Sequence, residues 1–211
     1  MCIRDSYETL SGNGEFYFYN TDTMVEMDKE DRLNGAVAVL PIIDFISDND
    51  KITQKAIELG MKEVIPYIGN ISKGKEDQFI RENFELIVET IRKSSGKIYI
   101  GNICWIEKFA KAGITVLGDF GLNIFNGFAI EGYMELGMHK GYGSLECIED
   151  REQQFPLMIS QHITKGEWLI DRRGQKIAIK KNAAKDKMIL VAENRIKNDK
   201  EPGTEGRVYM I

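Results

Sequence analysis

Short apolar runs alternate with amphipathic stretches along most of the chain. Five β-rich runs have the composition of strands that are buried on both faces of a parallel sheet: 15–19, 36–40, 63–68, 97–100 and 114–117. Helical patterns lie between or after them, at 51–59, 76–93, 105–112 and 127–136. This alternation predicts an α/β fold with a parallel sheet and crossover helices.

Glycines mark the ends of several predicted helices. Gly60, Gly113 and Gly137 each stand where a left-handed residue ends a helix. Gly69 and Gly101 follow predicted strands, but neither belongs to a dinucleotide-binding or phosphate-binding glycine pattern. The glycines are therefore interpreted as structural.

The pattern changes after residue 150, where short strands are predicted at 155–160, 167–171, 176–180 and 188–192. Five strands cannot close an eight-stranded TIM barrel. We therefore predict a partial TIM-like (β/α) barrel over 7–149, a small β-rich appendage over 150–196 and a tail over 197–211. Residues 1–6 resemble translated sequencing-adapter read-through, and the chain is expected to be the carboxyl-terminal part of a longer protein.

Polar side chains follow three of the predicted strands. Asp119, Asn123 and Asn126 come after 114–117, whereas Asn70 and Asn102 come after the two preceding strands. Because sites in (β/α) folds are built at the carboxyl ends of strands, these residues predict a polar pocket there. Two alternatives stay open: Asn126 as the N-cap of the following helix, and Asp119 as a turn residue.

Three segments in a fixed order resemble the peptidase U32 family, the collagenase-like proteases. They are Gly-Asp-Phe-Gly-Leu-Asn-Ile-Phe-Asn at 118–126, Gln-Phe-Pro-Leu-Met-Ile-Ser-Gln-His at 154–162 and Leu-Ile-Asp-Arg-Arg-Gly at 169–174, with Gly-Ser-Leu-Glu at 143–146 between the first two. The resemblance covers roughly 35–196.

This resemblance implies peptide-bond hydrolysis on a peptide or protein substrate, by a catalytic type that no sequence motif identifies. We assign catalytic roles to Asp119, Asn123 and His162, and substrate binding to Asn70, Asn102 and Asn126. His162 has an alternative reading, as a histidine that makes one hydrogen bond within the appendage. No metal ligands are assigned.

The number of cysteines bears on which functions other than peptide hydrolysis are considered. Some U32 relatives take part in hydroxylation of RNA bases or quinone precursors and carry an iron-sulfur cluster on four cysteines, whereas this chain has three: Cys2, Cys104 and Cys147. We predict no cluster and no other cofactor. The alternatives to a peptidase are therefore a hydroxylation protein that has lost its cluster cysteines, or a non-catalytic scaffold. A Cys104–His162 pair would suit thiol chemistry, but free cysteines are more often small buried apolar residues.

Net charge and hydropathy bear on whether the chain binds nucleic acid or a membrane. A net charge of −5 argues against binding nucleic acid through overall charge, and the basic stretch over 172–187 is interpreted as solvated surface. No apolar run approaches the roughly 20 residues of a membrane span, and no signal-peptide pattern is found. A cytoplasmic protein without a membrane partner is expected.

Overall fold

The parallel sheet predicted from the sequence forms the centre of the computed structural model. The structure describes residues 14–18, 20–27, 33–144, 156–160, 165–170, 172, 174, 176–181, 188–192 and 208–210. Within these residues, seven parallel strands pair in the order β11-β1-β2-β3-β4-β5-β6. Their bounds are β1 Glu15–Tyr17, β2 Val37–Pro41, β3 Glu63–Ile68, β4 Lys97–Ile100, β5 Thr115–Gly118, β6 Met138–Gly141 and β11 Val208–Met210.

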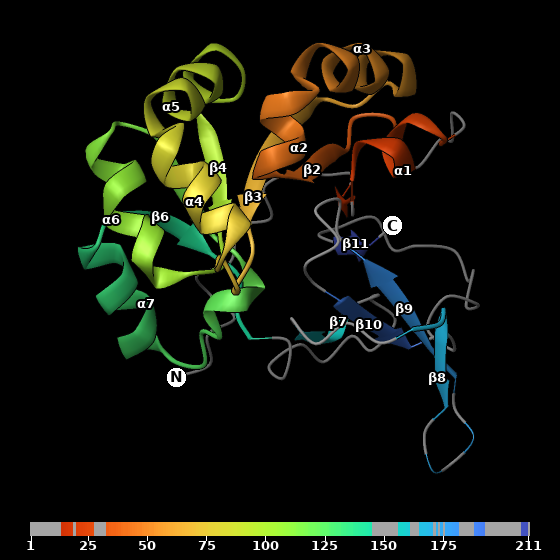
Figure 1. The fold of residues 1–211 in the computed structure, drawn as a ribbon. Coiled ribbons are helices and arrows are strands. Elements are labelled where there is room, and N and C mark those ends of the chain that lie inside the picture. The colour runs from red at the N-terminus through yellow and green to blue at the C-terminus, as the bar shows by residue number, and fades with distance from the viewer. Residues whose placement is uncertain are drawn as a thin grey trace.

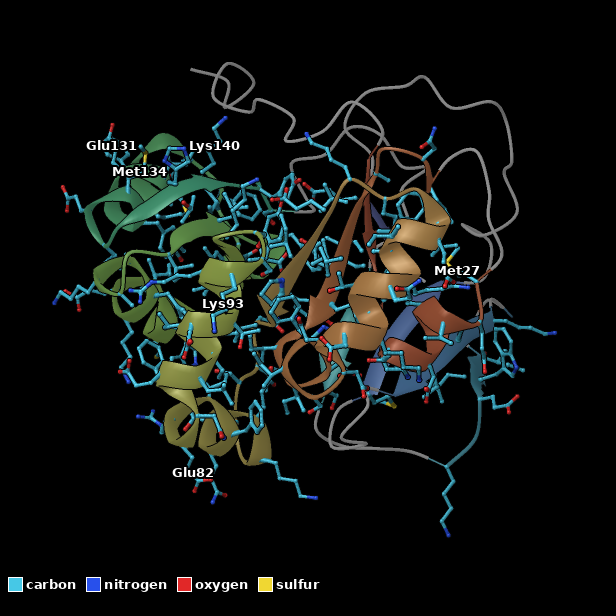
Figure 2. All side chains as sticks on the ribbon, turned by 90° about the horizontal axis from the view of Figure 1, so that it is seen from above. Met27, Glu82, Lys93, Glu131, Met134 and Lys140 are labelled. Carbon is cyan, nitrogen blue, oxygen red and sulfur yellow. The ribbon has the colours of Figure 1, made fainter. Side chains whose placement is uncertain are left out.

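Helices follow most of these strands and lie along one side of the sheet, as Figure 1 shows. They are α1 Thr21–Val25, α2 Ile42–Ser47, α3 Asn49–Leu59, α4 Lys75–Glu82, α5 Phe84–Lys93, α6 Ile103–Lys111 and α7 Gly127–Glu135. Figure 2 shows Glu82 of α4 extending outward from the ribbon. Among the described residues, none of the helices has the length and apolar character needed to cross a bilayer.

The expected α/β class is confirmed, and strands 63–68 and 97–100 have the predicted bounds. The single helix predicted over 76–93 is wrong, because Asn83 separates α4 from α5 with φ −113° and ψ 19°. The Asn83 amide donates to the Phe79 carbonyl oxygen at 2.9 Å. Asparagine side chains that bond to nearby backbone in this way compete with regular helix geometry.

Further elements differ from expectation. Helices α1 and α2 and strand β6 were not predicted, and the segment 197–211, expected as a tail, contributes β11 beside β1. The predicted C-cap glycines Gly60, Gly113 and Gly137 do have left-handed φ values of 75°, 75° and 100°. The glycines that end helices were therefore easier to predict from the sequence than the short helices and strands.

Alternate residues of the strands face opposite sides of the sheet. The even-numbered positions, such as Phe16, Leu40 and Ile98, pack into clusters with helix residues that include Ile52 and Ile106. The odd-numbered positions face the other side and are also buried: Tyr17, Val37, Val39, Ile65, Tyr99, Leu117 and Asp119. Both faces are thus shielded from water, as parallel sheets require.

Contacts between distant strands show that the sheet is strongly curved. The Tyr17 hydroxyl on β1 lies 3.0 Å from Asp119 Oδ1 at the end of β5. Because neighbouring strands lie about 4.8 Å apart, β1 and β5 would be separated by roughly 19 Å in a flat sheet. The odd-numbered face is therefore concave, and its side chains meet in the interior.

A second, antiparallel sheet follows in the order β7-β10-β9-β8. It comprises β7 Pro156–Ser160, β8 Trp168–Ile170, β9 Lys176–Lys181 and β10 Met188–Ala192, close to the four predicted strands. Its small core contains Ile179, Met188 and Leu190, with Leu169 and Ile177 packed against them.

Close packing at Gly118 gives a testable consequence. A methyl group on Gly118 would overlap the Met138 sulfur and lie 3.1 Å from the Gly141 Cα atom, so Gly118→Ala should lower the free energy of unfolding by about 1–3 kcal/mol. Gly132→Ala is the matched control, because nothing lies within 4 Å of its new methyl group and alanine favours the interior of α7 by about 0.5–1 kcal/mol. Urea denaturation measures both; equal effects would contradict the packing described.

Candidate functional site

Two carboxyl groups and several tyrosines meet on the concave face of the sheet. Asp119 follows β5, Glu15 begins β1, and both are 2% exposed. Tyr99 donates to Glu15 Oε1 at 2.5 Å, as Tyr17 donates to Asp119. We call these four residues, together with Tyr142, the acid–tyrosine cluster.

Aromatic contacts hold the cluster in place. The Tyr17 ring lies 5.5 Å from that of Tyr67 and 6.0 Å from that of Tyr99, measured between centroids. Tyr99 and Tyr142 are stacked at 5.9 Å, with 20° between their planes. Offset aromatic pairs at such separations are stabilising beyond the area they bury, so each hydroxyl group is carried on a firmly packed ring.

Asp119 has a strongly perturbed acidity. Burial raises its pKa from 3.8 to about 7, although hydrogen bonds from Tyr17 and from the backbone of Phe120 and Gly121 favour the carboxylate and limit the rise. The negative charge of Glu15 raises the pKa further. Asp119 can therefore hold or release a proton near neutral pH, which is the range that general acid–base chemistry uses.

Glu15 lies in a comparable environment. Burial raises its pKa, hydrogen bonds from Tyr142 and Tyr99 oppose the change, and the charge of Glu63 adds to it. Its Oε2 atom has no hydrogen-bond partner among the described residues. Burial also raises the pKa of Tyr99 well above 10, with the charge of Glu15 acting in the same direction, so this hydroxyl is a neutral donor.

The carboxyl ends of β3, β4 and β5 are brought together by small residues. A methyl group on Gly101 would lie 2.9 Å from the Asn70 backbone nitrogen and 3.2 Å from Asp119 Oδ2. One on Gly121 would lie 2.9 Å from the Asn70 Cβ atom. Glycine at both positions thus allows Asn70 and Asp119 to approach the same point.

Asn102 lies at this same edge, where its side chain has local partners. Its Oδ1 accepts from the Cys104 backbone N–H at 3.0 Å and caps α6, and its amide donates to Ser72 Oγ at 2.9 Å. Trp105 Nε1 donates to the same oxygen at 2.9 Å. The structure therefore brings Asn70, Asn102 and Asp119 to one edge, with Asn102 also serving as a helix cap.

Asn123 and Asn126 have structural contacts of their own. Asn123 has the left-handed φ of 56° and accepts from Ser144 Oγ at 2.7 Å. Asn126 accepts from the Ala129 backbone N–H at 3.0 Å and is the N-cap of α7, which confirms the capping alternative. Neither hydrogen-bonds to Asp119 in the described structure.

The remaining candidate site residues are His162 and the cysteines. His162 and Cys147 lie outside the described residues, so a pair of Cys104 with His162 has no described geometry. Cys104 is exposed. Within the described part of the chain, no group of three or more His, Cys, Asp or Glu residues is arranged to hold a metal ion.

Sequence reasoning missed Glu15, Tyr17, Tyr99 and Tyr142. One signal was present, since a glutamate and a tyrosine at alternate positions of Glu-Phe-Tyr within a strand that is otherwise apolar must share one face. That face is buried only because the sheet curves, which no local pattern indicates.

Comparison with known proteins gives no relative for this chain. No protein-family model, no curated protein and no solved structure matches it.

The raised pKa of Asp119 predicts a pH-dependent stability difference. A carboxyl group whose pKa rises on folding stabilises the fold below pH 3.8, and this contribution is lost as pH rises toward 7. Asp119→Asn, which removes the charge, should therefore become more stable relative to the unsubstituted protein between pH 4 and pH 8. The upper limit of this gain is about 4 kcal/mol, at 1.36 kcal/mol per pH unit.

Urea denaturation at the two pH values measures this difference. Asp22→Asn removes a carboxyl whose side chain is 82% exposed and serves as the control, which should show no comparable change. A pH-independent difference between the Asp119 variant and the unsubstituted protein would contradict the assignment of a near-neutral pKa.

Proposed function

We propose that this chain is a peptidase U32-type hydrolase in which Asp119 transfers protons during cleavage of a peptide bond. The observation that carries the proposal is the place of Asp119: buried at the carboxyl end of β5, bonded to Tyr17, and with a pKa raised to about 7. The resemblance of segments 118–126, 154–162 and 169–174 to the U32 family supplies the substrate class.

The curvature of the sheet supports a partial TIM-like (β/α) barrel as its framework. Strands β1 to β6 run parallel, helices lie along one face, and side chains from β1 meet those of β4 and β5 on the other. In barrels of this kind, the residues at the carboxyl ends of the strands carry the chemistry. Asp119, Asn70 and Asn102 occupy that edge.

The proposed reaction uses Asp119 in two protonation states. As a carboxylate it accepts a proton from a water molecule that attacks the peptide carbonyl carbon, and it then gives this proton to the leaving amine as the carbon–nitrogen bond breaks. The Tyr17 hydroxyl donates to Oδ1 and fixes the orientation of the carboxyl group. Asn70 is exposed at the same edge, and its side-chain amide is the candidate donor for a substrate carbonyl oxygen. His162 stays a predicted second proton carrier.

A non-catalytic scaffold is the second candidate. It is favoured by the hydrogen bonds within the chain, since Asp119, Asn102, Asn123 and Asn126 each accept one from a neighbouring group. Polar groups satisfied in this way also occur in purely structural positions. The two candidates differ in whether Asp119 is needed for turnover.

Hydrolysis of gelatin and of a fluorogenic peptide library by the purified chain tests the proposal. Asp119→Asn should lower kcat/KM by about 100-fold or more, because general acid–base groups contribute roughly 10²–10⁴-fold. The exposed Asp22→Asn serves as the matched control and should keep full activity. Thermal melts of both variants separate lost chemistry from lost folding.

The pH profile adds a second readout. Activity should increase as pH rises, with an apparent pKa near 7. Tyr17→Phe should raise this pKa, because it removes a hydrogen bond that stabilises the carboxylate. A folded Asp119 variant with undiminished hydrolysis would rule out the assigned role. A folded protein that cleaves no peptide would favour the scaffold.

A further inference from the structure

The carboxyl edge of the larger sheet carries exposed apolar side chains. Ile103, the first residue of α6, is 52% exposed. Phe125, just before the N-cap of α7, and Phe128, in the first turn of that helix, are 44% and 85% exposed. We call these three residues the apolar rim. Single apolar side chains on a surface need no explanation, whereas three large ones at the starts of two helices indicate a surface that a ligand covers.

Contacts on the backbone side tie the apolar rim to Asp119. A methyl group on Gly101, two residues before Ile103, would lie 3.2 Å from Asp119 Oδ2. The Tyr133 hydroxyl of α7 donates to the Leu122 carbonyl oxygen at 3.0 Å, which holds this helix against the loop that follows Asp119. Helices α6 and α7 therefore both begin at the edge that carries the candidate site.

The surroundings of the apolar rim favour a neutral ligand. Segments 101–106 and 120–130 contain no Asp, Glu, Lys or Arg, although these four types make up 29% of the chain. Backbone N–H groups at helix starts can attract an anion, but here Asn102 and Asn126 each accept from one of them as N-caps. Surfaces that lose their water on binding are likewise depleted in charge and enriched in aromatic residues.

We propose that the apolar rim binds a large apolar side chain of the peptide substrate, next to the bond that is cleaved at Asp119. This inference rests on the proposed peptidase function, which supplies the ligand. Ligand sites combine a mostly apolar lining with a few placed polar groups. The apolar rim supplies the first part, and Asp119, Asn70 and Asn102 supply the second.

The size of the apolar rim favours a side chain over a second copy of the chain. A stable interface between two proteins takes about 20–30 residues from each partner, whereas the rim has three. Contact with the rim removes apolar surface from water on both partners. A substrate with phenylalanine or leucine at this position is therefore favoured over one with serine or aspartate.

Internally quenched hexapeptides that differ only in one central residue, phenylalanine or serine, test this preference. The purified chain should cleave the phenylalanine peptide with a kcat/KM at least about 10-fold higher, because apolar contacts as small as one methylene change this constant roughly 10- to 200-fold. Phe128→Ala should lower the ratio of the two constants by about 5-fold or more, since it removes the most exposed ring of the rim. Phe128→Leu, which keeps a large apolar side chain, should retain most of the preference.

A matched pair of isoleucine substitutions provides the control. Ile103→Ala removes an apolar side chain from the rim, and Ile57→Ala removes one that is 68% exposed on α3. Only Ile103→Ala should lower the ratio for the two peptides. Thermal melts check that the variants stay folded, as expected for substitutions of exposed side chains.

A binding measurement separates this inference from the peptidase proposal. Fluorescence anisotropy with the Asp119→Asn chain and a fluorescein-labelled phenylalanine peptide reports binding without turnover. Binding that Phe128→Ala weakens, in a protein that hydrolyses no peptide, would refute the peptidase function and keep the apolar rim as a peptide-binding surface. Equal kcat/KM values for the two peptides would overturn the rim and keep the peptidase. A dimer that Phe128→Ala dissociates, seen by analytical ultracentrifugation, would assign the rim to a second copy and also overturn the proposal.

Discussion

The arrangement of the larger sheet depends on its curvature. The hydrogen bond between Tyr17 and Asp119 is direct evidence of that curvature. It joins the first and fifth strands in chain order, and such a contact exists only if the sheet curves. Curvature turns one face inward and lets that face be buried by its own side chains, while helices cover the other. The same curvature carries Glu15 to Tyr99, so two carboxyl groups share one interior.

Removing two carboxyl groups from water is unfavourable in free energy. Hydrogen bonds from the tyrosines offset part of this cost. A phenol has a large apolar ring that fills the interior and a hydroxyl that donates to a carboxylate without adding a positive charge. Arginine or lysine partners would have stabilised both carboxylates and lowered their pKa values. With tyrosines as partners, the pKa of Asp119 stays near neutrality. The choice of partner therefore makes a structural interior compatible with proton transfer.

Local signals in the sequence predicted much of the fold and part of the site. Strands 63–68 and 97–100 and the glycine at 60 were readable because period and turn chemistry act over a few residues. Asn83 broke a helix that periodicity alone made continuous. The hydrogen bond between Tyr17 and Asp119 joins residues 102 positions apart and depends on the curvature of the sheet, so no local sequence pattern predicts it. Asp119 was found because it ends a strand, whereas Glu15 begins one and was overlooked.

Net charge was the least informative of the sequence features, for a physical reason. Charges separated by more than about 10 Å are largely screened at ordinary ionic strength, so a ligand responds to the nearest face and not to the sum over the chain. Residues 165–187 carry a net charge of +5 and the remaining residues carry −10, so the sign of the net charge differs between parts of the chain. The total charge of the chain therefore does not decide which charge a ligand meets at a given part of the surface.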